Sequence, residues 1–87
     1  MKRINVIKLL ARPYVLELLK SLKKPKRFRD LKKVCKNDKT LAKRIKELQE
    51  NGLIECVGIK ENKRYINHYK LTKRGELILK KVNELKL

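Results

Sequence analysis

The residues of this sequence with the clearest chemical potential are its many lysines and arginines, whose positive charges can bind anionic partners. The 87 residues include 26 Lys and Arg but only 9 Asp and Glu, which gives a formal net charge of +17. Residues 20–46 hold 13 of the basic side chains and only Asp30 and Asp38 as acids, a net charge of +11. Basic residues concentrated on one element are typical of a surface that binds nucleic-acid phosphates. An anionic membrane and the lysine-rich surface of a thermophilic archaeon are the alternatives, although thermophilic surfaces usually balance the two signs.

Residues that could support catalysis or bind a metal are few. The only histidine, His68, matches no zinc-ligand spacing with Cys35 and Cys56. The three glycines form no phosphate-binding loop. The sequence therefore predicts a protein that is not an enzyme and that needs no cofactor and no metal. Buried, inert thiols are favoured over a redox or metal sensor.

The length of the chain predicts a single domain that spans residues 1–87. A domain this small has a small core and marginal stability, which a second subunit commonly remedies. No apolar run approaches the roughly 18 residues of a membrane span, and the N-terminus does not resemble a signal peptide. We therefore expect a cytoplasmic protein without a membrane contact.

Hydrophobic periodicity indicates five helices and one hairpin. Asn37 and Asp38 are suitable N-caps for the fourth helix, and Thr72 for the last. The predicted helices cover residues 3–11, 13–22, 28–35, 39–51 and 73–86. The third and fourth helices are separated by about three residues, as in a helix-turn-helix.

Two apolar runs rich in β-branched and aromatic residues, Leu53–Ile59 and Tyr65–Leu71, predict a β-hairpin. The length of the polar segment between them predicts a loop longer than a two-residue turn, and we expect residues 60–64 to project as a basic tip. We expect the tyrosines to pack in the core or on the hairpin. The predicted class is a mostly α protein with a small β-hairpin. Its helix-turn-helix lies at about 28–51, its hairpin at about 53–71 and its last helix at about 73–86.

Several segments resemble winged helix-turn-helix regulators. Lys24–Leu31 (KPKRFRDL) is similar to the first helix of the motif in HxlR-type proteins. Thr40–Ile54 (TLAKRIKELQENGLI) resembles their recognition helix and its exit into the wing, and Tyr69–Gly75 (YKLTKRG) resembles the wing's return strand. Ile4–Leu22, with its break at Arg12–Pro13, is more similar to ArsR-type repressors, and MarR-type regulators share the general pattern.

This resemblance implies winged helix binding to double-stranded DNA by a dimer, and it leaves the subfamily and any signal open. The wing lacks the proline usual in HxlR-type proteins, and no cysteine lies near the N-terminus as in their redox-sensing members. We expect a homodimer built from the first and last helices, because the last helix carries more apolar side chains than one thin domain covers.

Helical geometry assigns roles to the basic residues. With Leu41, Ile45 and Leu48 toward the core, the face with Lys39, Lys43, Lys46 and Glu50 points away, and Thr40, Arg44 and Glu47 lie on a flank. The predicted DNA-binding residues are Arg27, Arg29, Lys32, Lys33, Lys36, Lys39, Thr40, Lys43, Arg44, Lys46, Lys60, Lys63 and Arg64. Arg44 is expected to contact guanine and Lys33 to contact phosphate. The alternative is that Arg44 pairs with Glu47 or is solvated.

Three functions remain open from the sequence. The first is a sequence-specific, homodimeric transcriptional regulator. The second is an architectural DNA-binding protein with little specificity, which the high lysine content favours. The third is a protein-interaction module, which the basic stretch at residues 20–46 disfavours.

Overall fold

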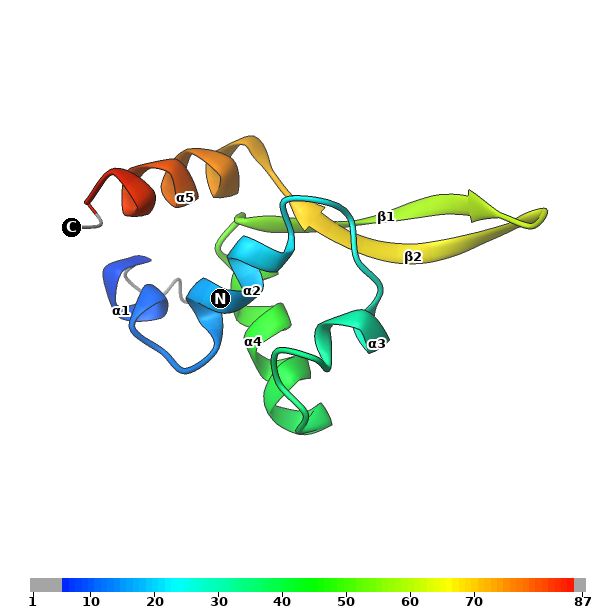
Figure 1. The fold of residues 1–87 in the computed structure, drawn as a ribbon, viewed down its shortest axis with the longest axis horizontal. Coiled ribbons are helices and arrows are strands. Elements are labelled where there is room, and N and C mark those ends of the chain that lie inside the picture. The colour runs from blue at the N-terminus through cyan, green and yellow to red at the C-terminus, as the bar shows by residue number, and fades with distance from the viewer. Residues whose placement is uncertain (1–5, 86–87) are drawn as a thin grey trace.

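A computed structural model describes residues 6–85 of the chain (Figure 1). Its elements are α1 (Val6–Leu10), α2 (Val15–Ser21), α3 (Phe28–Leu31), α4 (Asp38–Glu50), β1 (Ile54–Glu61), β2 (Arg64–Leu71) and α5 (Lys73–Leu85). The class predicted from the sequence, mostly helical with one antiparallel hairpin, is confirmed. The outermost parts of the predicted first and last helices, residues 3–5 and 86, lie outside the described residues.

The core is almost entirely aliphatic and lies where the five helices meet the inner end of the hairpin. Leucines dominate it because each amphipathic helix contributes one apolar stripe, and burying those stripes stabilises the fold. Ile54 and Leu71, which pair at the inner end of the hairpin, are also buried. The side chains that are completely inaccessible to solvent are Leu9, Val15, Leu18, Leu19, Leu41, Leu48 and Leu53.

The hairpin projects away from the helices, as Figure 1 shows, and gives the molecule a long axis of 43 Å against 27 and 26 Å. Its strands pair in register from Ile54 opposite Leu71 to Glu61 opposite Arg64. The turn therefore consists of Asn62 and Lys63 alone, and the predicted loop over residues 60–64 is wrong. Both turn residues have positive φ, 49° and 66°, which is the type I′ geometry that matches the twist of the two strands.

Two helices are shorter than the sequence predicts. α3 ends at Leu31, and the chain continues to Val34 in a tighter turn in which Lys32, Lys33 and Val34 donate to carbonyls three residues back. α2 begins at Val15 rather than at Pro13 because Tyr14, with φ 70°, is in the left-handed region and interrupts the helix.

α5 starts at a tight junction with the end of α4. The Thr72 hydroxyl donates to the Gly52 carbonyl at 2.6 Å and accepts from the Gly75 amide at 3.0 Å, so the predicted cap is confirmed. Gly75 is needed here because a Cβ at this position would lie 2.0 Å from the Leu53 carbonyl oxygen. The backbones of α5 and of the segment after α4 therefore approach more closely than any side chain allows.

The segment before α3 is joined to the hairpin by a short bridge. The Lys26 amide donates to the Tyr69 carbonyl at 2.9 Å, and the Tyr69 amide donates to the Lys26 carbonyl at 2.7 Å. This bridge fixes the start of the helix-turn-helix against β2. Within residues 6–85, none of the helices combines the length and the hydropathy needed to cross a membrane.

Candidate nucleic-acid interface

α4 is positioned by an N-terminal cap and an apolar stripe. The Asn37 side chain accepts a hydrogen bond from the Thr40 amide at 3.0 Å, which satisfies one of the free donors of the first turn. Leu41, Ile45 and Leu48 are buried, as the periodicity predicts. The opposite face is therefore exposed to solvent, and its basic side chains are those of Lys39, Lys43 and Lys46.

The segment around α3 supplies further exposed cations. Arg29 on α3 and Lys33 and Lys36 after it are exposed. Lys32 is ion-paired within the protein, because its Nζ lies 3.1 Å from Oδ1 of Asp38, the first residue of α4. That pair is well exposed on both sides and contributes little to stability, although it brings the end of α3 next to the start of α4.

The wing carries three exposed basic residues at its tip, namely Lys60, Lys63 and Arg64. The wing is tied back to the helix-turn-helix by Glu61, whose carboxylate forms an ion pair with Arg27, just before α3, and also contacts His68 on β2. The distance from His68 Nε2 to Glu61 Oε2 is 3.3 Å, and this contact is an ion pair only when the imidazole is protonated. Arg27 is thus engaged within the protein.

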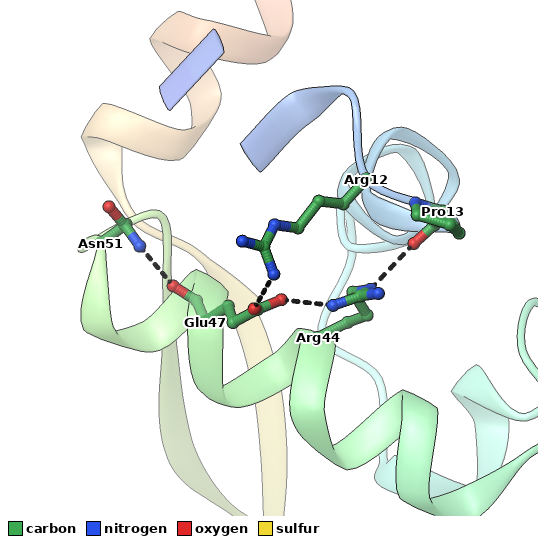
Figure 2. Close-up of polar contacts among 5 residues, drawn as sticks. All are labelled: Arg12, Pro13, Arg44, Glu47 and Asn51. Atoms are coloured by element: carbon green, nitrogen blue, oxygen red, sulfur yellow. Dashed lines mark hydrogen bonds and ion pairs between the residues drawn. The ribbon is translucent and has the colours of Figure 1, made fainter. Parts of the chain in front are cut away.

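Arg44 lies in a different environment from the lysines of α4. Its Nε donates to the Pro13 carbonyl at 3.2 Å, and its guanidinium forms an ion pair with Glu47 Oε1 at 2.7 Å (Figure 2). The side chain is only 12% exposed. The second oxygen of Glu47 binds Arg12 at 2.5 Å. The structure therefore has the pairing of Arg44 with Glu47 that the sequence left as the alternative to a guanine contact.

The remaining chemically interesting residues do not assemble into a site. Among residues 6–85, no group of three His, Cys, Asp or Glu side chains is arranged to hold a metal ion. Cys35 is buried, but Cys56 is exposed, so the expectation that both thiols are buried is wrong. Burial, and secondarily the neighbouring Cys56, raises the pKa of Tyr69 above its usual value.

Two of the three tyrosines differ from the prediction that they pack in the core or on the hairpin. Tyr69 is packed against the core as expected. Tyr65 lies on the hairpin and comes close to Gly58, but it is 75% exposed. Tyr14, which has φ 70° just before α2, is 42% exposed.

Of the 13 residues predicted to bind DNA, nine are exposed and form no ion pair among the described residues. The other four are half-buried or form ion pairs within the protein. The exposed set is Arg29, Lys33, Lys36, Lys39, Lys43, Lys46, Lys60, Lys63 and Arg64. Thr40 is half-buried, and Arg27, Lys32 and Arg44 are paired with acids. Sequence reasoning missed the ion pairs of Arg12 and Glu61, because Glu47 lies 35 residues from Arg12 and Arg27 lies 34 residues from Glu61.

Residues 11–87 match the model of the HxlR-like helix-turn-helix family. The chain belongs to that family. Its proteins are transcriptional regulators rather than enzymes, and the helix-turn-helix implies DNA binding. At the level of the family, the match therefore implies a DNA partner for the chain.

Solved structures share the winged helix-turn-helix fold. The reduced form of the transcriptional regulator YodB from B. subtilis superimposes with a TM-score of 0.79 at 26% identity, over 92% of this chain and 80% of that chain. The transcriptional repressor BigR from Xylella fastidiosa gives 0.70 at 24% identity, over 93% and 80%. A transcriptional regulator homologue from Pyrococcus horikoshii OT3 gives 0.66 at 20% identity, over 92% and 90%. No protein of curated function matches the sequence.

Proposed function

We propose that this HxlR-type regulator is a homodimer that binds specific double-stranded DNA sequences. The observation that supports this best is the exposed face of α4. Its first half presents Lys39 and Lys43 outward, while its apolar stripe holds the helix on the core. A recognition helix enters the major groove with its N-terminal residues leading, so the cations lie at the end of α4 that would meet DNA first.

The other basic residues fit the parts of such a complex that contact phosphates. We assign Arg29, Lys33 and Lys36 to the DNA backbone beside the major groove, because they precede the recognition helix and are exposed. Lys60, Lys63 and Arg64 at the tip of the projecting hairpin are assigned to the adjacent groove. Arg44 is not assigned to a base, because its guanidinium already binds Pro13 and Glu47.

The dimer is proposed from the outer face of α5. Leu77 and Leu85 are 58% and 78% exposed, although they are large apolar residues. Gly75 and Leu79 already supply the buried contacts of α5 with its own core. Exposed apolar side chains beside that contact usually indicate an interface, and α1 is the neighbouring N-terminal element proposed to share it.

An architectural protein with low specificity is the second candidate. The engagement of Arg44 favours it, because the described face of α4 then offers lysines, which bind phosphates as point charges, rather than an arginine that matches guanine. The two candidates differ in one property: a regulator discriminates between sequences, and an architectural protein discriminates little.

Selection from random duplexes with the full chain distinguishes the two candidates. We expect enrichment of an inverted repeat, since a two-fold symmetric dimer reads two half-sites about one helical turn apart. Retention of all sequences alike would support the architectural protein, and no retention at low salt would contradict DNA binding.

Sedimentation tests the dimer independently. At micromolar concentration the wild-type chain should sediment at twice the monomer mass, and Leu77→Asp with Leu85→Asp should sediment as a folded monomer. A monomeric wild type, with and without DNA, would contradict the proposed dimer. Replacement of the exposed Lys60 by Asp is the control for the added negative charge.

A further inference from the structure

Glu47 is the centre of a polar contact that joins two parts of the chain. Its carboxylate is nearly buried, with the residue only 8% exposed, and each of its oxygens binds a different arginine (Figure 2). Arg44 comes from the same helix, whereas Arg12 comes from the corner between α1 and α2. Arg44 also reaches that corner through the Pro13 carbonyl. Both arginines therefore connect α4 to the same short segment.

The corner to which α4 is attached is itself fixed. Leu9 before it and Val15 after it are completely buried. The Arg12 amide donates to the Leu9 carbonyl at 3.0 Å, and Tyr14 is held at φ 70°. A non-glycine residue stays in the left-handed region only when its surroundings determine the conformation. The corner is consequently anchored in the core on both sides of its turn, and α4 is attached to it.

The contacts fall on the second half of α4. Besides the two arginines, the Asn51 side chain donates to the Glu47 carbonyl at 2.8 Å, which ties the backbone of the same turn. Lys39 lies eight residues before Glu47, or about 12 Å along the helix axis. A tilt of about 5° at Glu47 would therefore move Lys39 by about 1 Å. A functional contact tolerates a displacement of only about 0.5 Å.

We propose that Glu47 is a positioning residue for DNA recognition. Together with Arg12 and Arg44 it forms a strut that sets the tilt of α4 against the α1–α2 corner, and through that tilt it determines where Lys39 and Lys43 meet the DNA. This inference rests on the proposed sequence-specific binding. The proposal also explains why the contact between α4 and the α1–α2 corner is made by charged rather than apolar side chains. Apolar residues of similar volume would stabilise the contact equally well, whereas a carboxylate between two guanidinium groups fixes directions as well as distance.

The test measures two properties of each variant: its discrimination between two duplexes and its own folding stability. The probes are the duplex most enriched from a random library by the wild-type chain and a scrambled duplex of the same composition, and the readout is the ratio of the two dissociation constants. Glu47→Gln should lower this ratio by about tenfold, equivalent to the loss of one well-read base pair. Glu50→Gln removes the same charge from the end of α4, and we expect it to leave the ratio unchanged.

Variants of Arg12 keep the test decisive if Glu47→Gln folds poorly. Arg12 is 36% exposed, so Arg12→Ala should still fold and should lower the ratio in the same way. Arg12→Lys keeps a cation opposite Glu47 and should retain most of the discrimination. Lys24→Ala removes one positive charge from an exposed loop residue and should weaken both duplexes alike. Arg12→Ala combined with Glu47→Gln should lose no more discrimination than either change alone, because both break the same strut.

The outcomes separate this inference from the proposed function. If Arg12→Ala and Glu47→Gln lower the melting temperature but leave the ratio at its wild-type value, the strut is structural only and the inference is overturned. If the wild-type chain itself shows no discrimination, the sequence-specific function fails, and the inference fails with it.

Discussion

The two halves of α4 contain the same kinds of charged residue in opposite situations. In the first half, Lys39 and Lys43 are exposed. In the second half, Lys46 is exposed as well, whereas Arg44 and Glu47 are turned toward the α1–α2 corner, where Glu47 pairs with both Arg44 and Arg12. A basic residue in this helix is therefore available to DNA only where no buried acid lies within reach. Side-chain type alone does not separate the two cases.

The largest loss of stability is expected where α5 packs against the segment that follows the second half of α4. Gly75→Ala places a Cβ 2.0 Å from the Leu53 carbonyl oxygen, which is backbone and cannot rotate away. We expect a loss of about 3 kcal/mol in the free energy of unfolding, at the upper end of the usual cost of overpacking. Urea unfolding of the purified variant measures this loss.

Gly58→Ala is the matched control, because a Cβ there would meet Tyr65 at an ordinary 3.7 Å. It should change the stability by less than about 0.5 kcal/mol. Equal effects of the two substitutions would mean that the junction between α5 and the end of α4 is looser than the structure indicates.

The next largest loss of stability is expected from removing Glu47, the acid that forms ion pairs with Arg12 and Arg44. Glu47→Ala leaves Arg44, which is 12% exposed, without its carboxylate and should cost about 2 kcal/mol. This value lies below the range for fully buried pairs because Arg12 is partly solvated and keeps its hydration. Glu50→Ala, a loss of the same charge three residues on, should cost less than about 0.5 kcal/mol by thermal unfolding. A similar cost for both would show that the contact of Glu47 with the two arginines adds nothing to stability.

A smaller effect is expected at the start of the helix. Asn37→Ala removes the side chain that accepts from the Thr40 amide and should cost about 1 kcal/mol. Asn37→Asp keeps the acceptor and should retain the stability. Because the cap holds the first turn, fraying of that turn in Asn37→Ala should appear as faster amide hydrogen exchange at Leu41. Unchanged exchange at Leu41 would show that the first half of α4 does not depend on this cap.

The sequence predicted the elements well because the signals for them are local. Apolar spacing located α4 and α5, and Asn37 and Thr72 marked their starts. The hairpin turn was missed because Asn62–Lys63 lacks the glycine that usually marks a two-residue type I′ turn. Exposure of Lys39, Lys43 and Lys46 followed from the helical period once the apolar stripe was identified.

The role of Arg44 was harder to infer from the sequence for a physical reason. Its second partner, Pro13, lies 31 residues earlier and comes close only after α1 and α2 pack on the core. The ion pair between Glu61 in the wing and Arg27 was equally hard to infer, since 34 residues separate the two side chains in the sequence. Long-range ion pairs depend on tertiary packing, so a chain with many lysines and arginines does not reveal which of them are free.

The claim that unpaired cations of α4 bind DNA is tested most directly by the salt dependence of duplex binding. The wild-type chain should show a plot of log affinity against log salt with a slope of several negative units, since each neutralised phosphate contributes about −0.9. Lys39→Gln, Lys43→Gln and Lys46→Gln in one chain should make the slope shallower by about 2 to 3 units per bound subunit. A wild-type slope near zero, or a slope that the triple substitution leaves unchanged, would contradict the account.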